Sequence, residues 1–225
     1  MLSKNRILKN GGMLVSESEI SRICALTGIT KAGGNRKSDL YVNGMGVSVK
    51  SFGDANPAIV NHTHRPGFEK ACNESGSDIG QLDVIIAEYW RLRVSGEIRE
   101  DVRNSHLQSP FSNFKTYLKP ILNYFMFDGS GRGRSQNSAD VLLDIINPCD
   151  TTTWMILGRD DALDLIWDYL VMSVRSKGMP KSYAPGLKPS LDVWTRYFDN
   201  LHKGTLHVRV HKSFHRIRMM CMSGQ

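Results

Sequence analysis

Residues 37–50 of this 225-residue chain read KSDLYVNGMGVSVK. Two short runs of β-prone residues flank Asn43-Gly44, and an Asn-Gly between two such runs is the strongest short-range signal for a β-hairpin. In the second run, valines alternate with Ser48 and Lys50, so the serine and the lysine share one face of their strand. The sequence therefore predicts a two-stranded hairpin with Asp39 on its first strand and Lys50 on its second.

This hairpin would bring a carboxylate close to a lysine. Together the two groups can hold a divalent cation and an attacking water at one phosphate group, which is the chemistry needed to hydrolyse a nucleic-acid backbone. A structural interpretation stays open beside this one. In it, Asp39 is a polar residue near a turn, and Lys50 is an exposed charge that protects an edge strand from unwanted pairing.

The hairpin resembles the core of the PD-(D/E)XK nuclease superfamily, in which an acid on one strand is followed on the next strand by acid-x-Lys. Asp39 matches the first acid, Ser48 stands in the position of the second, and Lys50 matches the lysine. The preceding residues 33–39, GGNRKSD, look like the lead-in of small type II restriction endonucleases that cut four-base-pair sites. The specific resemblance covers about residues 15–52. Ser48 departs from the family pattern because it replaces a metal-binding carboxylate.

The resemblance implies a magnesium-dependent, sequence-specific endonuclease for double-stranded DNA, of the type II restriction class. It implies that Asp39 and the backbone carbonyl of Val49 bind Mg²⁺, and that Asp39, Ser48 and Lys50 belong to the catalytic set. It also implies a cognate DNA methyltransferase in the same restriction–modification system, and it allows a homodimer. Two alternatives stay open: a DNA-binding protein on the same fold that has lost catalysis, which the replacement of an acid by Ser48 would explain, and a structure-specific or repair nuclease.

In the family, an acid on the helix before the hairpin completes the site. Residues 16–26 are predicted to form a helix, with Ser16 as N-cap and Glu19 as its capping-box partner. Because capping occupies Glu19, Glu17 is the better candidate for a catalytic acid that faces the hairpin. The helix dipole also favours acids in a first helical turn, so a purely structural role for Glu17 is the alternative.

The charge distribution points to a polyanionic partner. The net charge is +7, and the pI is about 9.3. Residues 138–170 are rich in aspartate, whereas residues 171–225 concentrate basic side chains among aromatic ones. A basic balance is typical of nucleic-acid binders, and the interspersed aromatic residues favour a folded surface over a disordered arm. A solvated basic segment without a ligand is the alternative.

Candidate DNA contacts lie in a glycine-rich segment and near the C-terminus. Residues 128–135 read DGSGRGRS, with no strand predicted directly before them and no Gly-Lys-Ser/Thr after them, so they do not match a nucleotide-binding loop. We expect their arginines to contact DNA instead. The alternative is that the segment is a mobile connector. Residues 206–211 alternate between apolar and basic, which predicts a strand with a basic face. The predicted DNA-contacting residues are Arg132, Arg134, Lys181, Lys188, Arg209 and Lys212.

The sequence has no apolar run of about 18 residues, so no membrane-spanning segment is predicted. The N-terminus is polar and basic and lacks an apolar signal core, which argues against secretion. The four cysteines are far apart, without a Cys-x-x-Cys pair, and are expected to be free thiols. Together these features predict a cytoplasmic protein.

The order of predicted elements favours a mixed α+β fold, in which a central mixed sheet is flanked by helices. This class agrees with the restriction-endonuclease-like core that the resemblance implies. We expect one nuclease domain over 1–225, with the catalytic core in 1–110 and the remaining sheet, helices and DNA-recognition elements in 111–225. The predicted helices cover residues 77–94, 112–127 (interrupted by Pro120), 138–146 and 162–174, and the predicted later strands cover 151–157 and 206–211.

Overall fold

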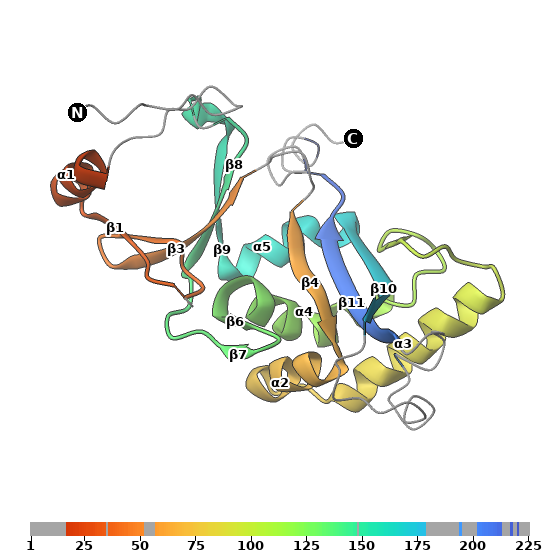
Figure 1. Cartoon of the computed structure of the whole chain (residues 1–225). Coiled ribbons are helices and arrows are strands. Elements are labelled where there is room, and N and C mark those ends of the chain that lie inside the picture. Colours follow the sequence, from red (N-terminus) through yellow and green to blue (C-terminus); the bar gives the residue numbers. More distant parts are fainter. Residues whose placement is uncertain are drawn as a thin grey trace.

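Figure 1 shows the computed structural model of the chain, which describes residues 17–34, 36–51, 57–147, 149–178, 194, 202–212, 217 and 220. The fold is mixed α+β, as predicted. It contains a five-stranded mixed sheet, a four-stranded antiparallel sheet and a small two-stranded ribbon. The helices are α1 (Glu17–Thr27), α2 (Arg65–Ser75), α3 (Ile79–Val94), α4 (Lys115–Asn123), the π-helical turn η2 (Tyr124–Asp128) and α5 (Arg159–Ile166), with 3₁₀ turns at Ser112–Phe114, Thr151–Thr153 and Trp167–Tyr169.

The five-stranded sheet has the order β1-β2-β3-β8-β9. Only β3 and β8 run parallel, and the other neighbours in this sheet are antiparallel. The four-stranded sheet has the order β4-β11-β10-β5, and β6 pairs with β7. The strands are β1 (Ile29–Lys31), β2 (Leu40–Val42), β3 (Met45–Ser51), β4 (Ala58–His64), β5 (Val102–Arg103), β6 (Gly129–Ser130), β7 (Gly133–Arg134), β8 (Val141–Ile145), β9 (Trp154–Gly158), β10 (Leu170–Gly178) and β11 (His202–Val210).

The predicted hairpin is present as β2 and β3. Leu40 pairs with Val47, and the two-residue turn has φ angles of 49° at Asn43 and 85° at Gly44. Positive φ at both central residues is the requirement of the turn type that matches the twist of the flanking strands. The Asn-Gly dipeptide therefore sets the register that places Asp39, the residue before β2, beside Val47 and Val49 in the middle of β3.

One predicted helix is a strand in the structure, and another is shorter than predicted. Residues 138–146 form β8, whose Leu142 and Asp144 are buried while their neighbours are half-buried. This period of two arises because β8 pairs with β3 on one side and β9 on the other, and the tertiary pairing overrides local helix propensity. The predicted helix 162–174 ends at Ile166, and the chain continues as β10 from Leu170.

The other central helices are confirmed. Asp78 caps α3 by accepting a hydrogen bond from the Gly80 N–H. Pro120 lies inside α4, and the helix widens into the π-helical turn η2 soon after it. Proline removes one helical N–H and crowds the preceding turn. The result is a turn whose residues Tyr124 to Phe127 are all buried in the core.

The helices α2, α4 and α5 connect the two sheets. α5 packs on β8 and β9, α4 contacts α5 and α2, and α2 contacts β4 and β11 (Figure 1). In β11, Leu206, Val208 and Val210 are buried on the core side, while His207 and Arg209 are only half-buried on the other side. Among the described residues, no helix is long and apolar enough to cross a membrane.

Candidate active site

Asp39 lies at the end of β2, with its carboxylate against the adjacent strand. Its N–H donates to the Val47 carbonyl at 2.8 Å, which continues the hairpin ladder by one residue. Its Oδ2 accepts the Val49 N–H at 2.6 Å and lies 3.5 Å from Ser48 Oγ. The hairpin thus brings Asp39 next to Ser48 and Val49, and Lys50 follows directly in β3.

The carbonyl of Val49 faces the same edge as Asp39. In an antiparallel pair, the N–H and C=O of one residue point to the same neighbouring strand. Because the Val49 N–H donates to Asp39, its C=O also points beyond the end of β2. This edge therefore offers two hard oxygen donors, one from the Asp39 carboxylate and one from the Val49 backbone.

Ser48 is 1% exposed and lies beside Leu142 of β8. A buried carboxylate needs a partner to offset its desolvation. Serine therefore fits this position without a metal, whereas the acid that the family pattern expects would need a cation nearby.

Lys50 is on the same face of β3 as Ser48 and lies in register with Asp144 of β8. Asp144 is completely buried. Neighbouring strands are about 4.8 Å apart, so the backbones of Lys50 and Asp144 are adjacent. The sequence analysis missed Asp144 because it assigned residues 138–146 to a helix. The run VLLDI of β8 shows no alternation of polar and apolar residues, so the sequence carried no signal for this strand.

A pocket of about 200 Å³ opens beside Lys50. None of the residues that line it is acidic, and two of them are lysines. Its lining consists of Lys37, Lys50, Ala58, Ile59, Asn61, Thr63, Phe125, Met126, Gly129, Ser130 and Gly131.

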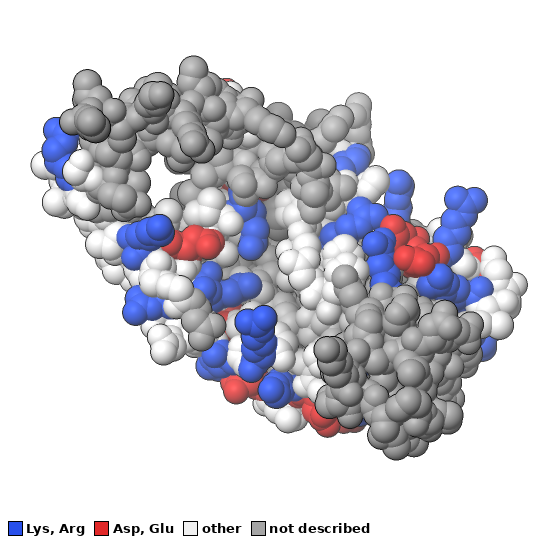
Figure 2. Space-filling model, in the orientation of Figure 1, with Lys and Arg blue, Asp and Glu red and all other residues white. Residues whose placement is uncertain are grey.

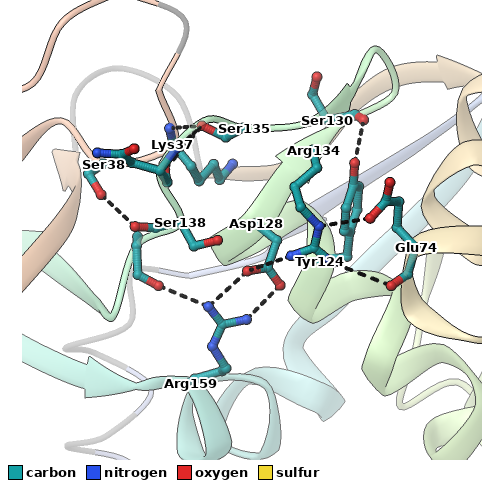
Figure 3. A network of polar contacts seen from close by, with 12 residues as sticks. Lys37, Ser38, Glu74, Tyr124, Asp128, Ser130, Arg134, Ser135, Ser138 and Arg159 are labelled. Atoms are coloured by element: carbon teal, nitrogen blue, oxygen red, sulfur yellow. Dashed lines mark hydrogen bonds and ion pairs between the residues drawn. The ribbon is translucent and has the colours of Figure 1, made fainter.

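Lys37 is held in place by the segment that leads into β8. Its N–H donates to Ser135 Oγ at 2.6 Å, and the next residue, Ser38, donates its hydroxyl to the Ser138 carbonyl at 2.8 Å (Figure 3). Burial and, to a smaller extent, repulsion from Lys50 lower the pKa of the Lys37 ammonium from 10.5 to about 8, although Asp39 and Asp128 act in the opposite direction. At neutral pH Lys37 is still mostly protonated, so its charge is available to an anion.

The glycine-rich segment 128–135 reaches the same pocket, although it is distant in sequence from the hairpin. Arg134 is bound to Glu74 at 2.7 Å, and Asp128 is bound to Arg159 at 2.6 Å (Figure 3). Arg159 and neighbouring cations hold the pKa of Asp128 below its usual value despite partial burial. These ion pairs fix the segment, so it is an ordered ribbon of β6 and β7. The Arg132 side chain is exposed and has no ion-pair partner among the described residues.

The remaining predicted residues are distributed elsewhere. Arg209 is on the four-stranded sheet and forms an ion pair with Asp101 at 3.0 Å. Lys212 lies over the Tyr169 ring and lines a separate pocket. Lys181 and Lys188 lie outside the described residues. Glu17 begins α1, which packs on the outermost strand β1, and its side chain is also outside the described part.

The oxygen donors at the hairpin edge are compatible with magnesium. Asp39 Oδ1 accepts no hydrogen bond within the described part of the chain, so it can bind a cation together with the Val49 carbonyl. Mg²⁺ commonly uses one or two carboxylates and completes its shell with waters and substrate oxygens. No group of three or more His, Cys, Asp or Glu side chains suited to a metal is present among the described residues. A cation here would therefore depend on the substrate for part of its coordination.

No protein-family model matches the chain, and neither the curated proteins nor the solved structures contain a match.

Proposed function

We propose that the protein is a magnesium-dependent endonuclease that hydrolyses phosphodiester bonds of double-stranded DNA. The observation that carries the proposal is the arrangement of Asp39 and Lys50. The carboxylate is bound at Val49, and the lysine is one residue further along β3 at the mouth of a pocket without acidic lining residues. An exposed acid beside a pocket with two lysines suits a cation and a phosphate better than it suits a packing role.

Each residue has a distinct part in this chemistry. A bound Mg²⁺ would supply Lewis-acid stabilisation of the phosphate and a more acidic water. Asp39 and the Val49 carbonyl provide its protein ligands. Lys50 donates to a phosphate oxygen and offsets the negative charge that develops in the transition state. Buried Asp144 is a positioning residue, since it lies beside Lys50 in the parallel register.

The restriction-type assignment is the finer part of the proposal. It includes sequence specificity, a cytoplasmic location, a cognate methyltransferase that protects host DNA, and a homodimer for cutting both strands. Incubation with phage or plasmid DNA in magnesium distinguishes the possibilities. Discrete fragments support restriction, whereas a smear supports a nonspecific or repair nuclease.

A second candidate function is DNA binding without catalysis. The specific observation in its favour is the burial of Ser48 where the family pattern has an acid, which leaves a single carboxylate at the hairpin edge. Retarded migration of DNA in a gel, with no cleavage at any magnesium concentration, would support this alternative.

The decisive experiment compares Asp39→Ala with Asp160→Ala. Asp160 is an exposed acid at the start of α5 and lines none of the pockets described above. We expect Asp39→Ala to abolish cleavage while DNA affinity stays within about tenfold, and Asp160→Ala to cut normally. Cleavage by Asp39→Ala at the wild-type rate would remove Asp39 from the site.

A further inference from the structure

A second basic pocket adjoins the first one. It has a volume of about 320 Å³ and again no acidic lining residue; it is lined by Arg36, Lys37, Gly129, Ser130, Arg132, Gly133, Arg134 and Ser135. Lys37, Gly129 and Ser130 line both pockets, so these residues mark their common border. Figure 2 shows lysine and arginine side chains gathered on this face, over β3, β6 and β7.

The cations of the second pocket are not equally available. Arg134 is neutralised by Glu74 and lies over the Tyr124 ring. Arg36 and Arg132 are exposed, and neither forms an ion pair within the described part of the molecule. With Lys37 they provide three positive charges around one opening. Such a group gains most from an anionic ligand, because like charges in proximity repel until they are neutralised.

The backbone at the border of the pockets is rigid. A Cβ atom on Gly131 would lie 2.6 Å from Thr63 Cγ2, and one on Gly129 would lie 2.4 Å from the Tyr124 hydroxyl. Close packing against β4 and η2 therefore requires glycine at both positions. The segment is preorganised, so it loses little conformational freedom when a ligand binds.

The N-terminus of α2 adds to the positive potential. Gly131 packs against Gly67 in the first turn of this 11-residue helix, and Thr63 just before the helix lines the first pocket. Helix N-termini carry partial positive charge from their backbone N–H groups. The lysines, the arginines and the helix end therefore act in the same direction.

We infer that the second pocket binds the backbone phosphate adjacent to the scissile one, with Arg36, Arg132 and the Ser130 hydroxyl as its contacts. Lys37 stands between the two phosphates and positions the strand so that the scissile phosphate meets Asp39 and Lys50. The identity of the ligand as a DNA strand rests on the proposed function. The chemical class, a phosphodiester on an extended polyanion, follows from two adjacent cationic pockets that share one wall.

The test uses DNA in which one phosphate at a time is replaced by an uncharged methylphosphonate. Binding is measured without divalent cations, so no strand is cut. For the wild type, we expect replacement at two adjacent positions to weaken binding about tenfold each. In the Arg36→Gln/Arg132→Gln double variant, one of these positions should lose its effect while the other keeps it. The matched control is Lys70→Met, an exposed lysine of α2 that lines neither pocket.

The double variant should also lower the salt slope of log affinity by about one unit, because the contact with one phosphate is lost. Equal sensitivity of the double variant and the wild type at every methylphosphonate position would overturn the inference. So would a salt slope of the double variant no lower than that of Lys70→Met, or wild-type protein that binds no DNA.

A second measurement addresses Lys37 itself. The Lys37→Met protein should lose affinity for DNA, because Lys37 lines both pockets and its charge is removed, whereas the Lys37→Arg protein should keep its affinity. Loss of affinity by both proteins to the same extent would exclude Lys37 from the contact. These outcomes are independent of cleavage. If the position effect is present and the protein cuts no DNA with magnesium, the inference stands and the endonuclease proposal fails.

Discussion

The two main sheets carry positive charge in opposite ways. Beside the five-stranded sheet, Lys37 and Lys50 line a pocket whose other lining residues include no acid. On the four-stranded sheet, Arg175 and Arg209 bind the two oxygens of Asp101 at 2.7 and 3.0 Å. The first arrangement leaves its cations for a ligand, whereas the second neutralises them within the fold.

This difference shows why a count of basic residues is a weak guide to a binding face. The sequence places much of its positive charge after residue 170, and part of it is on β10 and β11. Paired surface charges contribute modestly to stability and are screened by salt. The cations that matter for an anionic ligand are those without an ion-pair partner, and Arg36 and Arg132 beside the hairpin are two such residues in the described part of the chain.

The largest effect should come from the hairpin. Lys50→Ala is expected to reduce the cleavage rate by about 10²–10³-fold, because it removes a donor to the developing charge in the transition state. Single-turnover cleavage at saturating DNA measures this loss. Lys70→Ala is the control and should cut like the wild type. A Lys50→Ala rate within about threefold of wild type would mean that the pocket binds DNA but does not catalyse.

The next effect concerns the buried position that departs from the family pattern. Ser48→Asp should lower the free energy of unfolding by about 3 kcal/mol without metal, since it adds a carboxylate at a buried position whose serine Oγ lies 3.5 Å from Asp39 Oδ2. Magnesium should restore part of this loss, because a cation between the two acids offsets their repulsion.

Thermal unfolding with and without Mg²⁺ measures both the loss of stability and its partial recovery by the metal. Ser48→Ala is the matched control, and its stability should not respond to the metal more than that of the wild type. A Ser48→Asp protein that is equally unstable in both conditions would place the metal site elsewhere.

The hairpin could be predicted from sequence because local rules determine it. Asn43-Gly44 specifies the turn, and the alternation around Val47 specifies which residues share a face. The neighbours of the hairpin could not be predicted, because β8 becomes a strand through pairing with β3, about 95 residues earlier in the chain. The misassigned helix at residues 138–146 hid Asp144 for that reason.

The same distinction holds for the candidate site, where contacts within the hairpin could be predicted and contacts with distant segments could not. Asp39, Val49 and Lys50 lie within one local motif, so their proximity followed from register alone. Lys37 was part of the quoted sequence, yet its role depends on Gly129 to Gly131, which reach it only through the packing of β6, β7 and η2. Sequence spacing carries no signal for such a long-range contact.

A smaller effect is expected on the four-stranded sheet, where Arg209 and Asp101 form an ion pair. Because Asp101 neutralises Arg209, Arg209→Ala should weaken DNA binding less than threefold, and less than Lys37→Met does under the same conditions. Affinity measured at 50 and 200 mM salt compares the two variants. A contact of the Arg209 guanidinium with a base edge would instead cost about 1–3 kcal/mol and relax the preference at one base pair. A loss of that size would break the contrast between the sheets and identify Arg209 as a residue that reads the DNA sequence.

The smallest effect concerns a histidine pair on the same face. His207 of β11 stacks on His62 of β4, with ring centroids 4.5 Å apart, opposite a bulge where His62 adopts a positive φ of 37°. Burial lowers the pKa of His207 from 6.5 to about 4, and His62, Arg175 and Arg209 lower it in the same direction, while Asp101 opposes them. Despite its ion pairs, this face therefore disfavours any additional positive charge.

The sign of the pH effect follows from this lowered pKa. Between pH 6.5 and 4 the unfolded chain binds a proton at His207 that the folded protein does not, so the stability contributed by this residue falls as the pH drops through that window. His207→Gln should flatten this part of the stability curve, whereas His106→Gln, at an exposed position, should leave the curve unchanged. Urea unfolding at pH 7, 6, 5 and 4 provides the measurement. A His207→Gln curve parallel to that of the wild type would show that the face accepts the extra charge, and that its arginines are more fully neutralised than the ion pairs with Asp101 imply.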